Sequence, residues 1–192
     1  MNPRTRTFAV AFAVGLAAAV ATAWLTVNLR RRDVRPRATT AAAAPSTPAQ
    51  PGRKIKARLF YVSADGAKLA GLDREVAYGD GASAQAEEIV RAQLQAAPAP
   101  YLSAIPAGTS LRALYLNDKG EAYVDLSKEA ADAHSGGTED ELLTIYAIVN
   151  ALTTNLPAVT SVQLLVDGKE VDTLAGHVDL RRPLSRNAAL VE

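Results

Sequence analysis

The chain has 192 residues, of which 48% are hydrophobic, 21% charged and 5% aromatic, and it contains no cysteine. This composition excludes disordered, collagen-like and disulfide-stapled proteins, and the lack of cysteine excludes cysteine zinc sites, iron–sulfur clusters and thiol chemistry. The net charge of +1 divides unevenly, because residues 1–53 carry eight Arg against one Asp while residues 54–192 carry 13 Lys or Arg against 19 Asp or Glu. An acidic domain repels phosphate backbones, so we expect no nucleic-acid partner.

After a short tail of residues 1–7, residues 8–29 form an uncharged stretch of 22 residues with arginines on both sides. A helix needs roughly 20 apolar residues to cross the hydrocarbon core of a bilayer. The stretch therefore predicts a transmembrane helix or uncleaved signal anchor. A cleaved signal peptide is the alternative, because Ala21 and Ala23 have the spacing of a cleavage site.

The distribution of arginines around this segment bears on its orientation in the membrane. Five follow the predicted span within residues 30–37 and two precede it, so the positive-inside rule alone would place the following domain in the cytoplasm. A long domain is translocated largely regardless of the charges in its loops. We therefore expect a single-pass protein of the cytoplasmic membrane whose C-terminal domain lies in the periplasm or outside the cell, held by a basic and Ala/Thr/Pro-rich linker at residues 30–53.

The first half of the domain reads as two strands and a helix. Lys54–Ser63 alternates apolar and charged residues and predicts a half-buried strand, and Arg74–Tyr78 predicts a short second strand. Ser83 is a suitable N-cap for a helix that continues to about Ala97, where Pro98 ends it.

The second half begins with a predicted hairpin. Ser110–Leu116 and Glu121–Leu126 read as strands around a turn at residues 117–120. Thr138 and Glu141 have the spacing of a capping box, and the helix that follows carries an apolar stripe made of Leu142, Ile145, Tyr146, Val149 and Leu152.

A second hairpin closes the domain. Ser161–Val166 and Lys169–Leu174 flank Asp167-Gly168, which is a strong two-residue turn signal. The predicted order is β-β-α-β-β-α-β-β. This order indicates an α+β fold with one mixed, mostly antiparallel sheet, of which two helices cover one face.

Four stretches within residues 122–127, 134–138, 141–152 and 162–180 carry a family resemblance. They read AYVDLS, HSGGT, ELLTIYAIVNAL and VQLLVDGKEVDTLAGHVDL. In this order they resemble the GerMN domain of sporulation and spore-germination proteins, over residues 54–184, with residues 185–192 as a C-terminal tail. The resemblance implies a ring-building-motif-like fold, a place outside the cytoplasmic membrane and no enzymatic activity. The chain has one such domain where the sporulation protein has two in tandem, and it has no lipobox cysteine.

The two histidines, His134 and His177, lack an identifiable third ligand, so we expect no metal site. Ser135 adjoins His134, but neighbouring side chains seldom converge on one reacting atom, so we expect no catalytic triad. Gly136-Gly137 resembles an anion-binding turn, yet the hydroxyl of Thr138 is expected to occupy the free N–H groups of the helix.

Other residue types favour structural roles. The carboxylates of Glu121, Asp125 and Asp179 have no spacing that places two of them at catalytic separation, so we expect them to be solvated. Gly168 and Gly176 are expected in turns. We expect Tyr115, Tyr123 and Tyr146 to pack in the core and Arg181-Arg182 to lie in solvent. We predict no catalytic, cofactor-binding or metal-binding residue.

These observations predict a non-enzymatic, membrane-anchored, extracytoplasmic protein-interaction module for cell-envelope assembly, related to sporulation or germination. Its expected partners are another envelope protein, the membrane through residues 8–29 and a second copy of the chain in a homo-oligomer. The alternative is a module that binds peptidoglycan or another wall glycan. That function requires an exposed aromatic platform, and residues 54–192 contain no tryptophan.

Overall fold

The computed structural model describes residues 52–134 and 136–192. Its elements, in chain order, are β1 (Lys54–Val62), β2 (Leu69–Ala77), α2 (Gly81–Gln93), β3 (Leu111–Leu116), β4 (Glu121–Leu126), α3 (Glu129–Asp132), α4 (Thr138–Asn155), β5 (Ser161–Val166), β6 (Lys169–Glu170) and the 3-10 helix η1 (Ala188–Leu190). The predicted membrane span at residues 8–29 and the linker up to residue 51 lie outside the described residues. In the part that is described, no helix combines the length and the apolar character needed to cross a bilayer.

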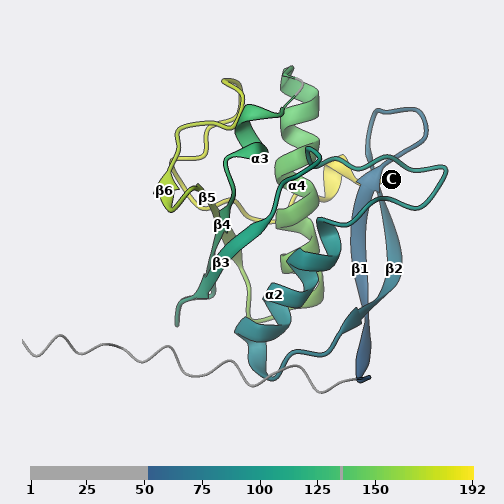
Figure 1. The fold of residues 1–192 in the computed structure, drawn as a ribbon, viewed down its shortest axis with the longest axis vertical. Coiled ribbons are helices and arrows are strands. Elements are labelled where there is room, and N and C mark those ends of the chain that lie inside the picture. The colour runs from purple at the N-terminus through teal and green to yellow at the C-terminus, as the bar shows by residue number, and fades with distance from the viewer. Residues whose placement is uncertain (1–51, 135) are drawn as a thin grey trace, which may run out of the picture. The chain divides into compact units, whose positions relative to one another are not determined.

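The domain has an α+β fold with mixed strand pairing, as the sequence predicts, but the strands form two sheets. Strands β1 and β2 pair antiparallel as a separate hairpin, and β3, β4, β5 and β6 form the second sheet in that order. Figure 1 shows α2 and α4 between the two sheets. The expectation of a single sheet with helices on one face is therefore wrong.

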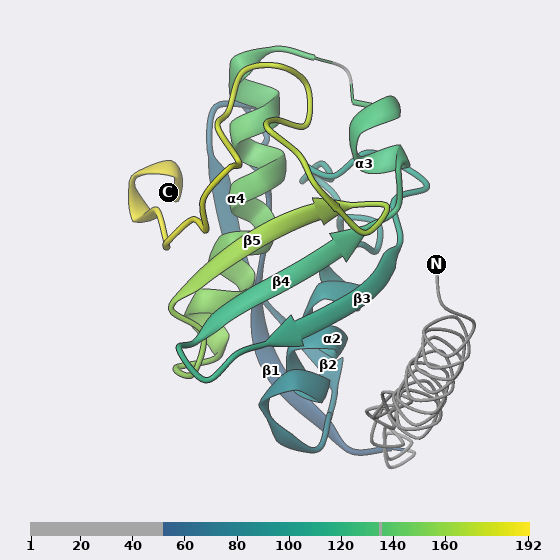
Figure 2. The same cartoon turned by 90° about the vertical axis from the view of Figure 1, so that its left-hand side faces the viewer.

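The four-stranded sheet is mixed because α4 separates two of its strands. β3 and β4 form an antiparallel hairpin, β4 and β5 pair in parallel, and β5 and β6 pair antiparallel. Parallel neighbours need a long crossover connection, and α4 supplies it. Figure 2 shows β3, β4 and β5 side by side with α4 behind them.

Helix α4 is buried around most of its circumference because sheets cover it on both sides. The predicted stripe places Ile145, Val149 and Leu152 in the core, but Leu143 and Ile148, which lie outside the stripe, are also buried. Helix α4 packs against β1 as well as against β5. A helix with apolar residues all round is typical of such a central position.

Alternation along the central strands supplies much of the core. Val124 of β4 and Val162 and Leu164 of β5 point toward the helices and are almost completely inaccessible to solvent. Burial of each such side chain stabilises the fold by about 1.5 to 3 kcal/mol. One continuous apolar cluster extends from β1 across both long helices to β5.

Three side-chain amides close the edges of extended segments by pairing with both backbone polar groups of one residue. Gln93 accepts from the N–H of Phe60 at 2.9 Å and donates to its C=O at 2.6 Å. Asn155 pairs in the same way with Arg58, with both distances 2.8 Å. These two amides replace the neighbouring strand that β1 lacks on its α4 side, and they satisfy backbone groups that would otherwise be unpaired.

The third such amide, Asn150 of α4, holds the C-terminal segment. It accepts from the N–H of Asn187 and donates to its C=O, both at 3.0 Å. Further along, Val191 bridges Leu69 in parallel, and the N–H of Glu192 donates to the C=O of Leu69 at 3.1 Å. The last residues of the chain are thus bonded to β2 and α4.

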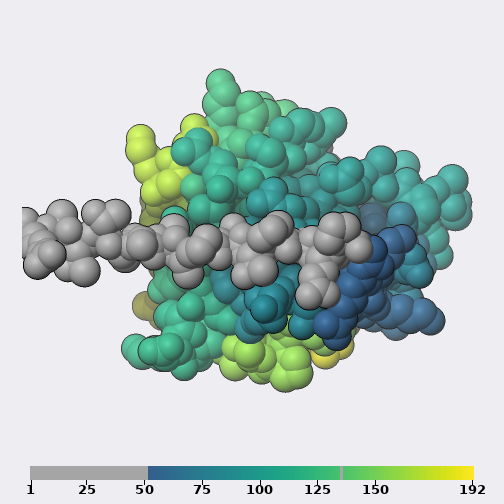
Figure 3. Space-filling model, turned by 60° about the horizontal axis from the view of Figure 1, so that its bottom comes forward, coloured from purple at the N-terminus to yellow at the C-terminus, as the bar shows by residue number. Residues whose placement is uncertain are grey.

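Two predicted element boundaries in the first half are wrong. The second strand begins at Leu69, five residues before the predicted Arg74, and pairs with β1 along its whole length. Helix α2 begins at Gly81, so Ser83 lies inside the helix and does not cap it, and the helix ends at Gln93. Buried Gln85 fixes the strand–helix connection, because it accepts from the N–H of Gly79 and donates to the C=O of Ala77, each at 3.0 Å. Figure 3 shows this lower face, where the blue surface of β1 adjoins the teal surface of α2.

The predicted turn at Asp167-Gly168 is confirmed, with φ values of 50° and 74°. Positive φ at both central residues is the geometry of a tight two-residue hairpin. The strand after it, however, spans only Lys169–Glu170 and does not reach the predicted Leu174. The chain leaves the sheet early because the backbone N–H groups around Leu174 bind a side chain of α4, as described below.

Candidate functional site

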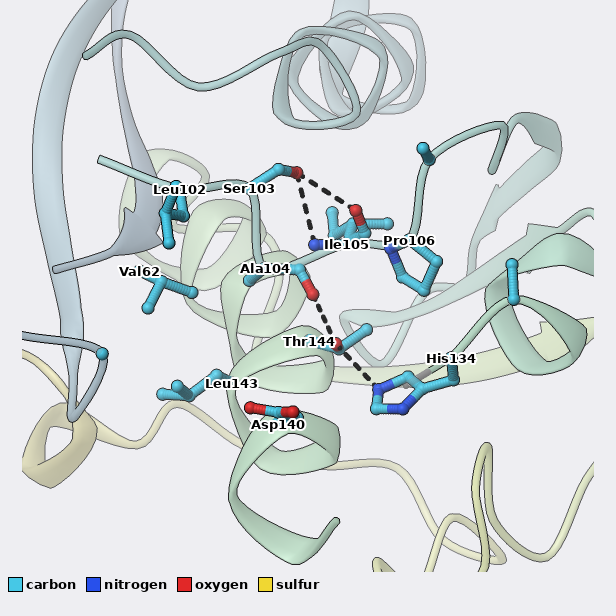
Figure 4. Close-up of a pocket in the computed structure, with 13 residues that line it drawn as sticks. Val62, Leu102, Ser103, Ala104, Ile105, Pro106, His134, Asp140, Leu143 and Thr144 are labelled. Atoms are coloured by element: carbon cyan, nitrogen blue, oxygen red, sulfur yellow. Dashed lines mark hydrogen bonds between the residues drawn. The ribbon is translucent and has the colours of Figure 1, made fainter. Parts of the chain in front are cut away.

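A surface groove of about 490 Å³ lies where the end of β1, the segment after α2, His134 and the first turns of α4 meet. Its lining residues are Val62, Gly66, Leu102, Ser103, Ala104, Ile105, Pro106, Ala107, Ala133, His134, Asp140, Leu143 and Thr144. Figure 4 shows that the 102–106 segment forms one wall, while His134 and α4 form the other.

The apolar wall of the groove is held against the end of β1. The backbone N–H of Val62 donates to the C=O of Leu102 at 2.9 Å, and the N–H of Leu102 donates back at 3.1 Å. This pairing fixes the backbone but leaves the Leu102 side chain in solvent, with 62% of the residue exposed. The 102–106 segment is tightened further by Ser103, whose hydroxyl donates to the C=O of Ile105 at 3.1 Å.

The polar wall is a chain of hydrogen bonds that begins at His134. The hydroxyl of Thr144 donates to the C=O of Ala104 at 2.5 Å, so its single proton is already used. His134 Nε2, 3.1 Å from this hydroxyl oxygen, must therefore be the donor. His134 Nδ1 accepts from the N–H of Gly136 at 3.1 Å, which matches the neutral Nε2–H tautomer. Both ring nitrogens and the Thr144 hydroxyl are thus engaged within the protein.

A second polar centre, next to the start of α4, consists of a buried carboxylate inside a loop. Glu141 is fully buried, and its Oε1 accepts from the N–H groups of Leu174 and Ala175 at 2.8 and 2.9 Å. Its Oε2 accepts from the N–H of His177 at 2.8 Å and lies 3.1 Å from Nδ1 of the same residue. The carboxylate of α4 therefore fills the anion-binding concavity that this loop creates.

These contacts set the charge state of Glu141. Burial by itself would raise the pKa of Glu141, because the ionised form loses its hydration. The N–H groups of Ala175, His177, Leu174 and Val178 together outweigh burial and hold the pKa below its ordinary value. The carboxylate is consequently a charged structural tie between α4 and the loop.

The predicted capping box at the start of α4 is wrong. The N-cap residue is Gly137, and none of the described side chains caps the helix. Glu141 occupies the box position in sequence but turns away to the loop at residues 174–177. Glu139, Asp140 and Glu141 still lie in the first turn, where negative charge interacts favourably with the helix dipole.

The three predicted surface carboxylates lie in separate clusters. Asp125 is nearly buried, accepts from the N–H of Gly168 at 2.7 Å and lies 3.3 Å from the guanidinium of Arg112. Asp179 forms a pair with Arg181 at 2.7 Å, which holds the pKa of Asp179 well below its usual range. Glu121 has its own partner, because the amide of Asn117 donates to it at 2.7 Å.

Arg112 also lies 2.7 Å from Asp167 and so joins β3 to the β5–β6 turn. Because Asp125 is nearly buried and lies beside the Arg112 guanidinium, the expectation that Asp125 is solvated is wrong.

The two histidines serve different parts of the fold. His134 faces the groove and His177 lies against Glu141. Over residues 52–134 and 136–192, no group of three or more His, Asp and Glu side chains could hold a metal ion. Ser135 lies outside the described residues.

Two tyrosines, Tyr115 and Tyr123, differ from the expectation that all three pack in the core. Tyr115 on β3 is 63% exposed and lies directly opposite Tyr123 of β4. Tyr123 is half-buried, and Tyr146 packs partly against the core. Alternation along β3 explains the difference, because Leu114 and Leu116 take the inner face and leave Tyr115 on the outer one.

Sequence reasoning missed the groove and the amides of Gln93, Asn150 and Asn155. The proline cluster around residues 98–106 was a usable signal for a structured segment, because three prolines restrict the backbone there. Nothing in the local sequence distinguishes the three amides from solvated ones.

The layered arrangement of two helices between a hairpin and a mixed sheet defines a GerMN-like α+β domain. The first GerMN domain of the sporulation protein GerM from Bacillus subtilis has this fold, with a TM-score of 0.54 at 18% identity, over 69% of this chain and 98% of that one. The tandem GerMN domains of the same protein give 0.55 at 19% identity, over 69% of this chain and 46% of theirs. A candidate lipoprotein from Clostridium perfringens gives 0.50 at 23% identity, over 70% of this chain and 89% of that one.

Residues 58–172 match the Germane family, whose description is sporulation and spore germination. The chain therefore belongs to this family. A search of curated proteins finds no significant match. The expected family resemblance is thus confirmed.

Proposed function

We propose that this chain is a non-enzymatic, membrane-anchored, extracytoplasmic module that docks to another cell-envelope protein during sporulation or spore germination. The description of the family supports a role in sporulation or spore germination. The likeness to a candidate lipoprotein supports a membrane-attached domain outside the cytoplasm. The uncharged stretch at residues 8–29 has the length of a membrane anchor.

The groove beside Leu102 is the observation that carries the docking proposal. Its apolar wall is fixed to β1, while the Leu102 side chain at its rim remains mostly in solvent. Burial of a leucine side chain by a partner yields about 1.5 to 3 kcal/mol. The His134 and Thr144 side chains use their hydrogen-bonding atoms within the protein, so the groove presents mainly apolar surface together with the Asp140 carboxylate.

A pull-down from detergent-solubilised envelopes tests this docking. The full-length protein and the Ser185→Asp variant should recover the same partner, whereas Leu102→Asp should lose it. Both variants add one negative charge at an exposed position, but Ser185 lies away from the groove. Recovery of that partner by Leu102→Asp, or by the anchor segment alone, would count against the groove.

A reporter fused after Glu192 tests the orientation. We expect enzymatic reporter activity only from a reporter that works outside the cytoplasm. Activity from a cytoplasm-specific reporter would contradict the extracytoplasmic placement. It would favour the cytoplasmic orientation that the arginines of residues 30–37 indicate.

Binding to peptidoglycan or another wall glycan is a second candidate, favoured by the exposed ring of Tyr115 opposite Tyr123. Aromatic faces on an open sheet are suited to stacking against sugar rings. Sedimentation with purified sacculi tests it: the full-length protein in detergent should sediment and Tyr115→Ala should not. Equal sedimentation of the two proteins would exclude this face as a glycan site.

A further inference from the structure

The four-stranded sheet has an open edge at β3. In the strand order β3-β4-β5-β6, β3 is a terminal strand, and among the described residues it has a strand partner on one side only. Figure 2 shows it as the outermost strand of the sheet. An edge strand presents a row of backbone N–H and C=O groups to a further strand.

The register identifies the residues that present these groups. The N–H of Asn117 donates to the C=O of Glu121 at 3.1 Å, in the same register that pairs Tyr115 with Tyr123. In an antiparallel ladder, alternate residues direct their polar groups to the partner strand. Tyr115 and Asn117 therefore face β4, and the backbone groups of Leu114 and Leu116 point outward.

After Arg112, this edge lacks the charged side chains that protect the edge of β2. The sequence Ala113-Leu114-Tyr115-Leu116 is uncharged. On β2, the corresponding outward positions include Asp73 and Glu75, both exposed. Antiparallel self-pairing through β2 would therefore bring like charges together, which is a known protection against edge pairing.

The open edge of β1 is occupied from within the chain. Asn155, Gln93 and Leu102 bond to the backbone of Arg58, Phe60 and Val62, respectively. Of these three edges, the one at β3 combines backbone groups that have no partner among the described residues with an uncharged segment at Ala113–Leu116.

We propose that two copies of this chain pair through β3, antiparallel and edge to edge, about a two-fold axis centred on Tyr115. In this register Leu114 of one copy lies opposite Leu116 of the other, so that their outward N–H and C=O groups bond across the axis. The two Tyr115 rings become direct cross-strand neighbours on the outer face. Aromatic pairs in such positions stabilise strand pairing.

Arg112, at the irregular start of β3, is already paired with Asp125 and Asp167 of its own chain, so the pairing rests on the uncharged segment that follows it. Registers centred on Leu114 or Leu116 lose the tyrosine pair. The pairing uses a surface other than the groove, so it does not depend on the docking function proposed above.

The absence of cysteine from the chain allows a direct test by disulfide cross-linking. Directly opposed strand residues have Cβ atoms about 4.5 to 5.5 Å apart, close to the separation that a disulfide spans. The full-length Tyr115→Cys protein, in native membranes with a mild oxidant, should form a disulfide-linked dimer. Ser185→Cys is the control, because Ser185 is also exposed but lies neither on β3 nor in the groove.

We expect Tyr115→Cys to cross-link roughly ten-fold faster than Ser185→Cys, because pairing raises the effective concentration of the two thiols. Equal rates would overturn the proposal. Adding Leu116→Pro to Tyr115→Cys removes an outward N–H and places a ring at the edge, where proline is tolerated in the fold. Cross-linking should then fall to the control rate, provided that thermal unfolding shows a folded protein. Undiminished cross-linking in the folded double variant would show random collision and would also overturn the proposal.

Discussion

Glu141 of α4 and His177 meet although 36 positions separate them in the sequence. One carboxylate oxygen of Glu141 accepts from the backbone N–H of His177 at 2.8 Å and lies 3.1 Å from its imidazole Nδ1. Together with the bonds from Leu174 and Ala175, this contact ties the long loop after β6 to the first turn of α4.

The first prediction is that Glu141→Gln destabilises the fold by about 3 kcal/mol. The amide N–H group of a glutamine would face backbone N–H donors, and the remaining bonds would lose their charge. Urea unfolding of the purified protein measures the change. Glu139→Gln, at an exposed position in the same helical turn, is the control and should alter stability by less than about 0.5 kcal/mol. Equal stability of the two variants would mean that the loop does not need the carboxylate.

The second prediction concerns pH. The folded-state pKa of Glu141 lies below its unfolded value, so its contribution to stability is complete above the unfolded pKa of about 4.3 and is lost as the pH falls toward the folded pKa. The stability difference between the natural protein and Glu141→Gln should therefore shrink as the pH is lowered from about 5 into the acid range below the unfolded pKa. Urea titrations across this range measure it, and a difference that grows on acidification would contradict the prediction.

The third prediction concerns the amide that closes the edge of β1. Gln93→Leu keeps an apolar shape but leaves the buried N–H and C=O of Phe60 without partners, which should cost about 2 kcal/mol. Hydrogen exchange should show faster exchange of the Phe60 amide. Gln95→Leu, at an exposed position two residues away, should leave both measurements unchanged. Slow exchange of the Phe60 amide in Gln93→Leu would mean that another group accepts a hydrogen bond from the N–H of Phe60.

The fourth prediction compares two glycines with the same φ of +81°. At Gly66 an added Cβ would meet open space, whereas at Gly120 it would lie 2.7 Å from the C=O of Ala158. Gly66→Ala should lose about 1 to 2 kcal/mol from backbone strain alone, and Gly120→Ala should lose clearly more because the carbonyl must move. Thermal unfolding of both variants measures the difference. Equal losses would show that the connection before β5 adapts freely.

Local patterns were sufficient for the elements whose signals are local. The turn residues at 117–120 predicted a strand at Glu121–Leu126, which has the observed bounds of β4, and Asp167-Gly168 predicted the turn after β5. The family resemblance, which rests on motifs in residues 122–180, was confirmed by the family match. These features depend on residues that are close together in the sequence, so the sequence alone was enough to predict them.

Other assignments failed because a distant partner competes for the same group. Glu141 has the spacing of a capping residue, yet three backbone N–H groups of a later loop bind its carboxylate more extensively than one helix terminus could. The strand at Lys169 ends early for the same reason. Tyr115 was assigned to the core on its residue type, but alternation along an edge strand placed it in solvent.

The sequence by itself determined the order of strands and helices, the uncharged segment at residues 8–29, the acidic character of the domain and its family. Tertiary structure alone decided that the strands divide into two sheets, that the Leu102 groove exists and that β3 has an open edge. The physical reason is range: hydrophobic periodicity and turn chemistry act over a few residues. Sheet partition, burial of a carboxylate and exposure of an edge depend on which distant segments pack together.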